Sequence, residues 1–272
     1  MNDFICPVCG GALLKREKTY SCGKGHSFDI AKSGYVNLLP SSGKGKRHGD
    51  DKLMVRARTA LFSRGHYDNL SDLIADFADE YAKKDVRVLD AGCGEGKYTC
   101  DVLSRLTRAG KEPVVIGVDI SKDALIQTAR RSKELRLAAA SSAALPLPDG
   151  SIDLILNIFS PFIGGEFHRV LRPGGKLIRA YPLARHLWEL KALIYDRPYE
   201  NPVADMEEDG FCIIDRREIR YPIHLSNSEE IMALFQMTPY YYKTGAADQA
   251  KAQKAETLDT MLEFGVVVYE RI

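Results

Sequence analysis

The stretch Val88-Leu-Asp-Ala-Gly-Cys-Gly-Glu-Gly-Lys97 decides the fold of this chain. An apolar strand ends in an acid, glycines follow at alternate positions (Gly92, Gly94 and Gly96), and a helical pattern begins at Lys97. Glycine lets the backbone turn sharply and approach a ligand closely. Such loops occur at the carboxyl ends of parallel strands, where α/β sheets bind their ligands. The stretch therefore predicts a ligand-binding α/β sheet.

Strands and helices alternate on both sides of this loop. Strands are predicted at 86–90, 113–119, 151–157, 175–181, 211–225 and 264–271, and helices at 52–64, 70–81, 97–108, 122–133 and 165–171. Apolar strands that alternate with helices predict a mostly parallel sheet covered on both faces, here with an antiparallel last strand. A capping box, Ser226 to Glu229, predicts a further helix in the insert between the two late strands.

Metal-binding residues crowd the front of the chain. Cys6, Cys9, Cys22 and His26 have the spacing C-x2-C-x12-C-x3-H, which fits a tetrahedral Cys3His zinc site. Four protein ligands leave no open coordination position, so the zinc is predicted to be structural. Structural zinc contributes about 10–16 kcal/mol of binding free energy, which a small ribbon without a large core needs. The alternative is three incidental thiols and a surface histidine; Cys93, Cys100 and Cys212 are predicted to be small apolar fillers.

The charge is unevenly distributed along the 272 residues. The net charge is only +1, and a hydrophobic content of 45% is ordinary for a globular protein. Residues 1–66, however, hold 12 Lys+Arg and 5 Asp+Glu, a net of +7, whereas residues 67–272 carry a net of −6. This asymmetry predicts a polyanion partner. No targeting signal or run of about 18 apolar residues is seen, so we expect a cytoplasmic protein without a membrane span.

Two further motifs sharpen the interpretation of the glycine loop. Asp119 ends the next strand and is placed to accept hydrogen bonds from ribose hydroxyls, and Arg169-Val-Leu-Arg-Pro-Gly-Gly-Lys176 precedes a later strand. The three motifs in this order resemble the S-adenosylmethionine-dependent class I methyltransferases. The resemblance implies that Asp90 lies near the methionine end of the cofactor and that Asp119 holds the ribose. Ser141 and Ser142 are the polar candidates for adenine contacts; a dehydrogenase or an inactive doubly wound domain is the alternative.

The whole chain is similar to a narrower family, the 23S rRNA guanine-N1 methyltransferases (the RlmA family). The motifs that carry this resemblance are the Cys3His ribbon, the stretch 28–40 that ends in Gly-Tyr-Val-Asn-Leu-Leu-Pro, Ala57-Arg58, Gly65-His66-Tyr67, Ala184-Arg185-His186-Leu187 and Gln236-Met-Thr-Pro-Tyr240. The resemblance implies zinc at the four ribbon ligands and cofactor contacts at Tyr67, Gly94, Glu95 and His186. We expect a zinc ribbon at 1–36, a basic linker and first helix at 37–66, and a methyltransferase domain at 67–272.

The expected reaction is methyl transfer to N1 of a guanine in a hairpin loop of 23S rRNA. Because N1 takes part in Watson–Crick pairing, the target guanine must be unpaired or flipped out. Asn157 and Phe159, in the segment Asn157-Ile-Phe-Ser-Pro161, are the candidate catalytic residues. We expect Phe159 to stack on the base, and Asn157 or backbone carbonyls to meet its edge. The alternative is that this segment is only a strand end and a turn.

Affinity for RNA is expected from the basic front. The candidate phosphate contacts are Lys15, Arg16, Lys18, Lys24, Lys44, Lys46 and Arg47. The alternative is a solvated charged face. Arg56 and Arg58 lie two apart on a helix and cannot share one tight face, so one of them is expected to face RNA or the cofactor cleft. A homodimer that grips one hairpin is a further hypothesis. Two other functions stay open: a small-molecule methyltransferase with a ribbon for docking, and a non-catalytic zinc-dependent RNA-binding protein.

Overall fold

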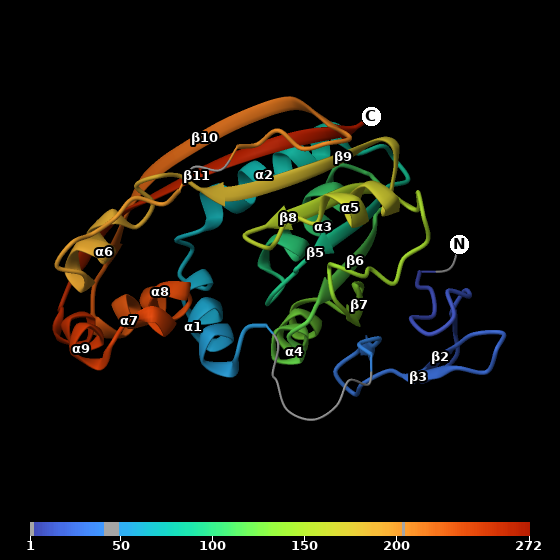
Figure 1. Cartoon of the computed structure of the whole chain (residues 1–272), viewed down its shortest axis with the longest axis horizontal. Helices are drawn as coiled ribbons and strands as arrows, with labels where there is room; N and C mark the ends of the chain where they lie inside the picture. Colours follow the sequence, from blue (N-terminus) through green and yellow to red (C-terminus); the bar gives the residue numbers. More distant parts are fainter. Residues whose placement is uncertain (1–2, 41–48, 203–204) are drawn as a thin grey trace.

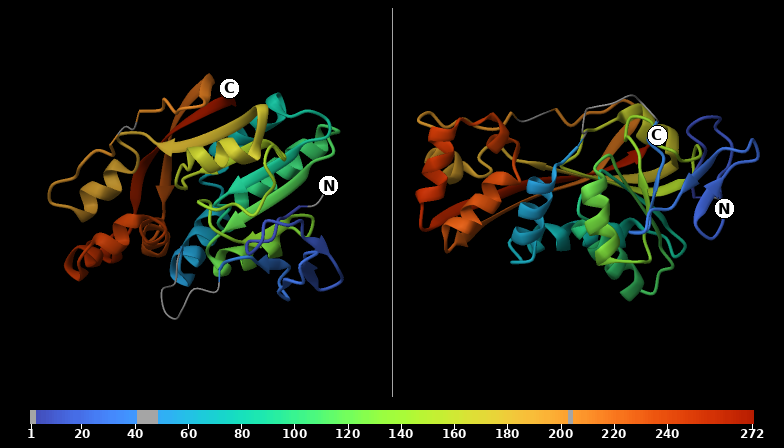
Figure 2. Two further views of the ribbon diagram at one scale, coloured as in Figure 1. Left: turned by 45° about the vertical axis from the view of Figure 1, so that its right-hand side comes forward. Right: turned by 90° about the horizontal axis from the view of Figure 1, so that it is seen from below.

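The computed structural model describes residues 3–40, 49–202 and 205–272. Figures 1 and 2 show an elongated molecule with three parts in a row. The amino-terminal ribbon lies at one end, a large twisted sheet with its helices occupies the middle, and the later helices α6 to α9 gather at the other end. The sheet therefore separates the ribbon from the carboxyl-terminal helices.

The central sheet has the order β10-β11-β9-β8-β5-β6-β7-β4. Its strands are β4 (Tyr35–Asn37), β5 (Arg87–Ala91), β6 (Val114–Asp119), β7 (Arg136–Ala139), β8 (Ile152–Ile158), β9 (Leu171–Pro182), β10 (Phe211–Leu225) and β11 (Leu258–Arg271). Strands β4 to β9 pair in parallel, and the last strand, β11, runs antiparallel between β9 and β10. The predicted mostly parallel sheet with an antiparallel last strand is confirmed.

The helices agree with the six predicted ones to within a few residues, and the described residues add three short ones, α6, α8 and α9. The described helices are α1 (Lys52–Phe62), α2 (Asp68–Tyr81), α3 (Lys97–Arg108), α4 (Lys122–Arg131), α5 (Gly164–Val170), α6 (Trp188–Ile194), α7 (Ser228–Gln236), α8 (Pro239–Lys243) and α9 (Ala246–Lys254). The predicted capping box is wrong by one residue: Asn227 caps α7 by accepting from the Glu230 amide at 2.9 Å, and Glu230 accepts from the Ser226 amide. Among the described helices, none is long and apolar enough to cross a membrane.

The sheet is buried on both faces, as the near-continuous apolar strands require. Along β11, Val266 and Val268 face one core and Val267 the other. The first core contains side chains from α2 and α3, such as Phe77 and Val102. The second core contains side chains from α5 and, unexpectedly, from the ribbon. The ribbon therefore covers a part of one sheet face.

The ribbon shares its hydrophobic core with the central sheet. Its strands β1 (Leu14–Lys15), β2 (Thr19–Ser21) and β3 (Ser27–Asp29) form a small antiparallel sheet. Phe4, Leu13 and Tyr20 are buried in the second core of the main sheet. The Ile5 amide donates to the Pro146 carbonyl at 2.9 Å, and β4 then extends the main sheet beside β7. Neither β4 nor β7 is among the predicted strands, because each has only three or four residues.

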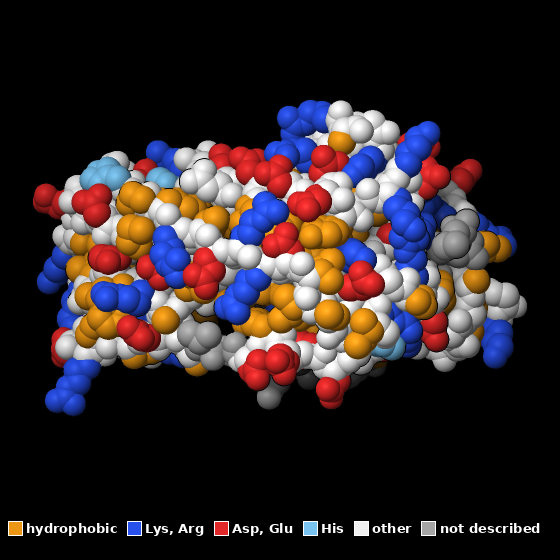
Figure 3. Space-filling view, turned by 90° about the horizontal axis from the view of Figure 1, so that it is seen from above, with side chains coloured by type: hydrophobic (Ala, Val, Ile, Leu, Met, Phe, Trp, Pro, Cys, Tyr) orange, Lys and Arg blue, Asp and Glu red, His pale blue; other side chains and the backbone are white. Residues whose placement is uncertain are grey.

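The face above the sheet carries charges of both signs. Figure 3 shows Lys and Arg side chains interspersed there with Asp, Glu and apolar ones. Arginines of the edge strand β10 form ion pairs, Arg217 with Asp215 and Arg220 with Glu218. This face therefore does not present the field of a single sign that would attract a polyanion.

Candidate functional site: a zinc cluster and a cofactor cavity

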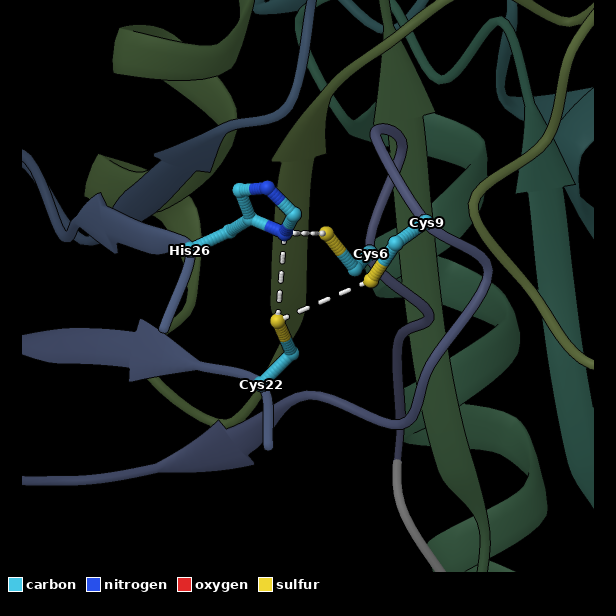
Figure 4. Close-up of side chains that lie close together, drawn as sticks. All are labelled: Cys6, Cys9, Cys22 and His26. Carbon is cyan, nitrogen blue, oxygen red and sulfur yellow. Dashed lines mark hydrogen bonds between the residues drawn. The ribbon is translucent and has the colours of Figure 1, made fainter. Parts of the chain in front are cut away.

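The four predicted metal ligands lie together at the base of the ribbon (Figure 4). Cys6 and Cys9 precede β1, and Cys22 and His26 come from the connection between β2 and β3. The His26 Nδ1 atom lies 3.5 Å from Cys6 Sγ and 3.4 Å from Cys22 Sγ, and Cys9 Sγ lies 3.7 Å from Cys22 Sγ. Zinc bonds of about 2.3 Å to sulfur and about 2.0 Å to nitrogen put the corners of a tetrahedron about 3.5–3.8 Å apart. The donor set therefore fits zinc, with His26 binding through Nδ1.

The backbone around Cys22 favours a thiolate. Burial raises the pKa of the Cys22 thiol, but the backbone amides of His26 and Lys24 donate to its sulfur and prevail, so that the pKa is lowered to about 6. A thiolate is the form that binds zinc. Because all four positions are protein ligands, the zinc is structural.

The other cysteines have different surroundings. Cys93 is buried in the first core, and Cys100 is partly buried against it, as expected of apolar fillers. Cys212 is exposed, so its prediction as a filler is wrong. It lies on the edge strand β10, where a side chain that points away from the sheet meets no other layer.

A cavity of about 690 Å³ opens at the carboxyl ends of the parallel strands. From β5 the chain adds β6 and β7 on one side and β8 and β9 on the other, so the strand order reverses between β5 and β8. Ligands of open α/β sheets bind at such switch points. The lining comes from parts of the chain within 49–67, 92–98, 119–120, 141–143, 158–163, 179–187 and 237–240, together with Phe264.

The glycine loop is packed too closely for side chains. Gly96 has a φ of +86°, and a Cβ there would lie 2.5 Å from Cγ2 of Thr128. A Cβ on Gly92, with a φ of +95°, would lie 2.6 Å from the Ser160 Cβ. The loop therefore passes between α4 and the segment after β8 with its backbone bare, and Gly92 and Gly94 line the cavity.

The two predicted acids occupy different depths. Asp119 lines the cavity, where its Oδ2 accepts from the Gly94 amide at 2.8 Å and its Oδ1 from the Ser121 amide at 2.7 Å. Each carboxylate oxygen keeps a second lone pair for a ligand hydroxyl. Asp90 is buried outside the cavity lining, and burial raises its pKa to about 7. Its Oδ2 accepts from Thr99 at 2.5 Å, whereas its Oδ1 has no partner within the described part of the chain.

Tyr67 and His186 also line the cavity, and they belong to parts of the chain other than the glycine loop. The Tyr67 ring is 1% exposed and lies 5.0 Å from the ring of Phe62 and 5.7 Å from that of Phe264. Burial lowers the pKa of His186 to about 3, and its Nδ1 accepts from the Glu263 amide at 3.1 Å. A neutral imidazole that accepts through Nδ1 carries its proton on Nε2. His186 is therefore an N–H donor toward a ligand.

The remaining predicted cofactor residues differ in what they offer. Ser141 and Ser142 line the cavity, at the end near Asp119 and Ile120 in the sheet. Glu95 also lines it, but its carboxylate accepts from Arg131, at 2.7 Å from Nε, so the side chain is engaged within the fold. Gly96 is not among the lining residues; it shapes the loop. The bare glycine cradle and the Asp119 carboxylate fit the nucleoside part of a cofactor, whereas Asp90 lies behind the lining and does not face a ligand.

The two candidates for the target base have distinct places. Phe159 lines the cavity, is 45% exposed and has a φ of +53°, a strained backbone for a non-glycine residue. Asn157 is 1% exposed and does not line the cavity. Its amide donates to Ser160 Oγ at 2.6 Å and to the Pro161 carbonyl at 3.2 Å, so it holds the loop that presents Phe159.

Several cavity residues were not predicted as contacts. Arg58 and Asp50 form an ion pair in the lining, which answers the question of which arginine of α1 faces the cleft. Tyr98 and Tyr181 also line the cavity, and each has a hydroxyl group. Residues 237–240 belong to the motif that carried the family resemblance, which was the available signal for them.

The expected RNA contacts on the ribbon are solvent-exposed. Lys15 lies on β1, Arg16 and Lys18 lie on the turn between β1 and β2, and Lys24 lies two residues after Cys22. None of the four has an ion-pair partner in the ranges that the structure describes. Lys15 also borders a second cavity, of about 440 Å³, with Lys133 and Arg136 of the main sheet's side. Lys44, Lys46 and Arg47 lie outside the described residues.

These features together define an S-adenosylmethionine-dependent class I methyltransferase. Solved structures share the fold: the YcgJ protein from Bacillus subtilis has a TM-score of 0.52 at 16% identity, covering 74% of this chain and 97% of that one. The [4+2]-cyclase SpnF has a TM-score of 0.51 at 17% identity, covering 81% of this chain and 93% of its own. Because one of them is named a cyclase, the fold does not by itself give the reaction.

The chain belongs to the 23S rRNA (guanine-N1)-methyltransferase family. A family model described as "RlmA, N-terminal" matches residues 4–47, and one described as "Methyltransferase domain" matches residues 88–175. A Micromonospora griseorubida protein assigned by name to this family is 34% identical over 89% of this chain and 88% of its own length. The "23S rRNA (guanine(748)-N(1))-methyltransferase" of Streptomyces fradiae is 38% identical over 68% of this chain and 65% of its own. The cofactor of this chain is S-adenosylmethionine, and the Cys3His cluster is the structural zinc site of the chain.

Proposed function

We propose that this protein transfers the methyl group of S-adenosylmethionine to N1 of a guanine in 23S rRNA, in the cytoplasm. The observation that carries the proposal is the cavity, which runs from the glycine loop to the exposed ring of Phe159. Its volume of about 690 Å³ lies within the usual range for small-molecule sites. One cavity thus offers both a cofactor cradle and a place for a base, in a chain of this family.

The target guanine enters the cavity unpaired. Its N1 is hidden inside a duplex, so a hairpin loop or a flipped base is the form that the site accepts. Phe159 stacks on the base at the cavity mouth, and the strained backbone at φ +53° is held by the Asn157 amide on the adjoining loop. Strain maintained by neighbouring hydrogen bonds is typical of residues that contact a ligand.

The chain contributes alignment and charge stabilisation. S-adenosylmethionine supplies a methyl group on a positively charged sulfur, which needs no activation by the protein. Guanine N1 attacks as its proton passes to solvent water, and negative charge grows on O6 during this step. Tyr98 and Tyr181 line the cavity with buried hydroxyls that have no hydrogen-bond partner in the described ranges, and one of them donates to O6. His186 does not take the proton on Nε2, because that nitrogen already carries one.

The RNA backbone binds on the ribbon side of the molecule. The exposed cations Lys15, Arg16, Lys18 and Lys24 neutralise phosphates. Lys15 shares a groove with Lys133 and Arg136, of which Arg136 is paired with Asp3 in the same lining. Because the ribbon shares a core with the sheet, its cations keep a fixed relation to the cavity. A homodimer that grips one hairpin stays a prediction, which light scattering of the protein with and without a hairpin RNA tests.

Primer extension tests the activity and names the base. An N1-methyl group blocks pairing, so reverse transcriptase stops on 23S rRNA from cells that contain the protein and reads through when the gene is removed. In cells from which the gene has been removed, a gene copy with Asp119→Ala should not restore the stop. A copy with Asp259→Ala, which changes an exposed carboxylate bound to His224, should restore it. Identical stops with and without the gene contradict the proposal. Methyl transfer only to small molecules, or no binding of cofactor, favours one of the two other functions.

A further inference from the structure

Helix α1 projects one arginine into the cofactor cavity. Arg58 and its ion-pair partner Asp50 both line the cavity, with side chains 22% and 31% exposed. A Cβ on Gly94 would lie 3.4 Å from Nη1 of Arg58, so the guanidinium reaches the glycine loop. Arg56, two residues earlier on the same helix, is exposed and outside the lining.

The other cations of the lining are more fully engaged. Lys97 is held by Asp68 at 2.6 Å and Asp101 at 3.0 Å. Arg179 pairs with Glu208 at 2.9 Å and packs over the ring of Phe162. Among the described residues of the lining, Arg58 is thus the cation with a single partner. The acids Asp50, Glu95 and Asp119 line the same cavity, so an anionic ligand group finds its favourable partner at Arg58.

The segment before α1 holds Arg58 in place. The Ser121 hydroxyl donates to the Asp50 carbonyl at 2.7 Å, which ties Asp50 to the end of β6. The next residue, Asp51, caps α1 through the Met54 amide at 2.9 Å and accepts from the Tyr242 hydroxyl at 2.9 Å. Asp50 occupies only a part of the guanidinium, which has five N–H donors in a planar fork. The remaining donors match the two oxygens of a carboxylate.

We propose that Arg58 binds the carboxylate of the cofactor's amino-acid end and that Asp50 orients it. S-adenosylmethionine has one anionic group, this carboxylate, beside an ammonium and a sulfonium. Asp119 is placed at the ribose, and Arg58 lies against Gly94, the residue whose amide donates to Asp119. Arg58 is therefore a positioning residue that fixes the methionine end and with it the direction of the methyl group. The proposal concerns the cofactor and does not depend on which base is methylated.

Two ligands separate this role from a structural one. S-adenosylhomocysteine has the amino-acid end, whereas 5′-methylthioadenosine keeps the nucleoside and the sulfur without it. Calorimetry on Arg58→Ala should show a dissociation constant for S-adenosylhomocysteine raised about 10- to 100-fold, as for loss of a charged hydrogen-bonded pair. The constant for 5′-methylthioadenosine should change by less than about twofold. Arg58→Lys keeps the charge without the planar fork of donors, so its dissociation constant for S-adenosylhomocysteine should lie between those of the wild type and Arg58→Ala. The constants of Arg56→Ala should match those of the wild type.

Three results overturn the proposal. Equal losses for the two ligands place Arg58 at the nucleoside or in the fold. An unchanged constant for S-adenosylhomocysteine in Arg58→Ala removes the residue from the cofactor site. Unchanged cofactor binding with weakened binding of a 23S rRNA fragment assigns Arg58 to a phosphate instead. Circular dichroism of each variant checks folding, and Arg58→Lys provides the test if Arg58→Ala does not fold.

Discussion

The zinc cluster is formed by residues that are close together in the sequence, and the cofactor cavity by residues that are far apart in it. The four zinc ligands lie between residues 6 and 26, on two short turns. The cavity is lined by residues from 49 to 264, which only the order of the sheet brings together. The first site depends on local spacing and a metal, and the second on long-range strand pairing. A local site is predictable residue by residue, whereas a long-range site is predictable only where its motifs are local.

The two sites also differ in what depends on them. Phe4, Leu13 and Tyr20 of the ribbon are buried against one face of the central sheet, so the zinc supports packing beyond the ribbon. The cavity lies at the end of the sheet and supports ligand binding. Damage at the zinc site should therefore extend into the fold, and damage at the cavity should stay at the site unless the backbone itself is strained.

The largest effect is expected from Cys22→Ser. A structural zinc site that loses a thiolate loses its tetrahedral set, so the zinc content should fall from about one per chain to near zero. Hydrogen exchange should rise over residues 4–30 and on the sheet face beneath them, while α2 and α3 stay protected. Cys212→Ser, at an exposed position, should keep its zinc. Full zinc content in Cys22→Ser contradicts the ligand assignment.

The next effect tests the strain in the glycine loop. Gly96→Ala combines a positive φ with a clash against Thr128, which together should cost about 2–5 kcal/mol of stability. Gly110→Ala has a φ of +76° with nothing within 4 Å and should cost only about 1 kcal/mol. Urea unfolding compares the two. Equal losses of unfolding free energy in the two variants would mean that the close packing of Gly96 against α4 adds nothing to the effect of the positive φ.

The third prediction separates the two ends of the cavity. Phe159→Ala should lower kcat/KM for RNA about 5- to 150-fold, because a base–aromatic stack contributes about 1–3 kcal/mol. The dissociation constant for S-adenosylhomocysteine should stay the same, and Phe159→Tyr should remain close to the wild type. If cofactor binding falls in parallel with activity, Phe159 is a wall of the cofactor site rather than a base contact.

Buried titratable groups in and beside the cavity should give opposite pH dependences. His186, with its pKa lowered to about 3, stays neutral while the unfolded chain takes up a proton below about pH 6.5. Its contribution to stability is therefore lost as pH falls, by about 1.4 kcal/mol per pH unit. Asp90, with its pKa raised to about 7, stays protonated where the unfolded group is ionised, so its contribution is lost as pH rises from about 4 to 7.

Two variants resolve these slopes. His186→Gln should lose less stability than the wild type between pH 6.5 and 4, and Asp90→Asn should lose less between pH 4 and 7. Denaturant unfolding at each pH measures both. Parallel curves for the wild type and His186→Gln would contradict a buried neutral imidazole.

The smallest effect is expected on the exposed ribbon. Changing Lys15 and Lys18 together to Ala should reduce the slope of log affinity for RNA against log salt by about 0.7–0.9 for each phosphate contact removed. Lys243 and Lys254, exposed at the opposite end of the molecule, form the control pair. An unchanged slope in the ribbon variant removes these lysines from the interface.

How far the sequence reaches is clearest at individual residues. Asp119, Gly92 and Gly94 line the cavity, and the sequence points to them because they follow apolar strands that end in an acid or in glycines. Glu95 lies in the same loop, but its carboxylate is bound to Arg131, 36 positions away, which no local pattern reveals. Asn157 likewise binds its own loop rather than lining the cavity. The short strand β7 escapes prediction because Arg136–Ala139 is too brief for a periodic signal.

The sequence by itself determined the zinc ligands, the glycine loop, the place of Asp119 at the end of its strand and the mostly parallel sheet. These follow from spacing, turn chemistry and alternation, which act over a few residues. Only the tertiary structure decided that Arg58 and Phe159 meet the same cavity, that the ribbon and the sheet share a core, and that β4 completes the sheet beside β7. Those relations depend on strand order and register, because pairing between distant segments is selected by the packing of the whole chain.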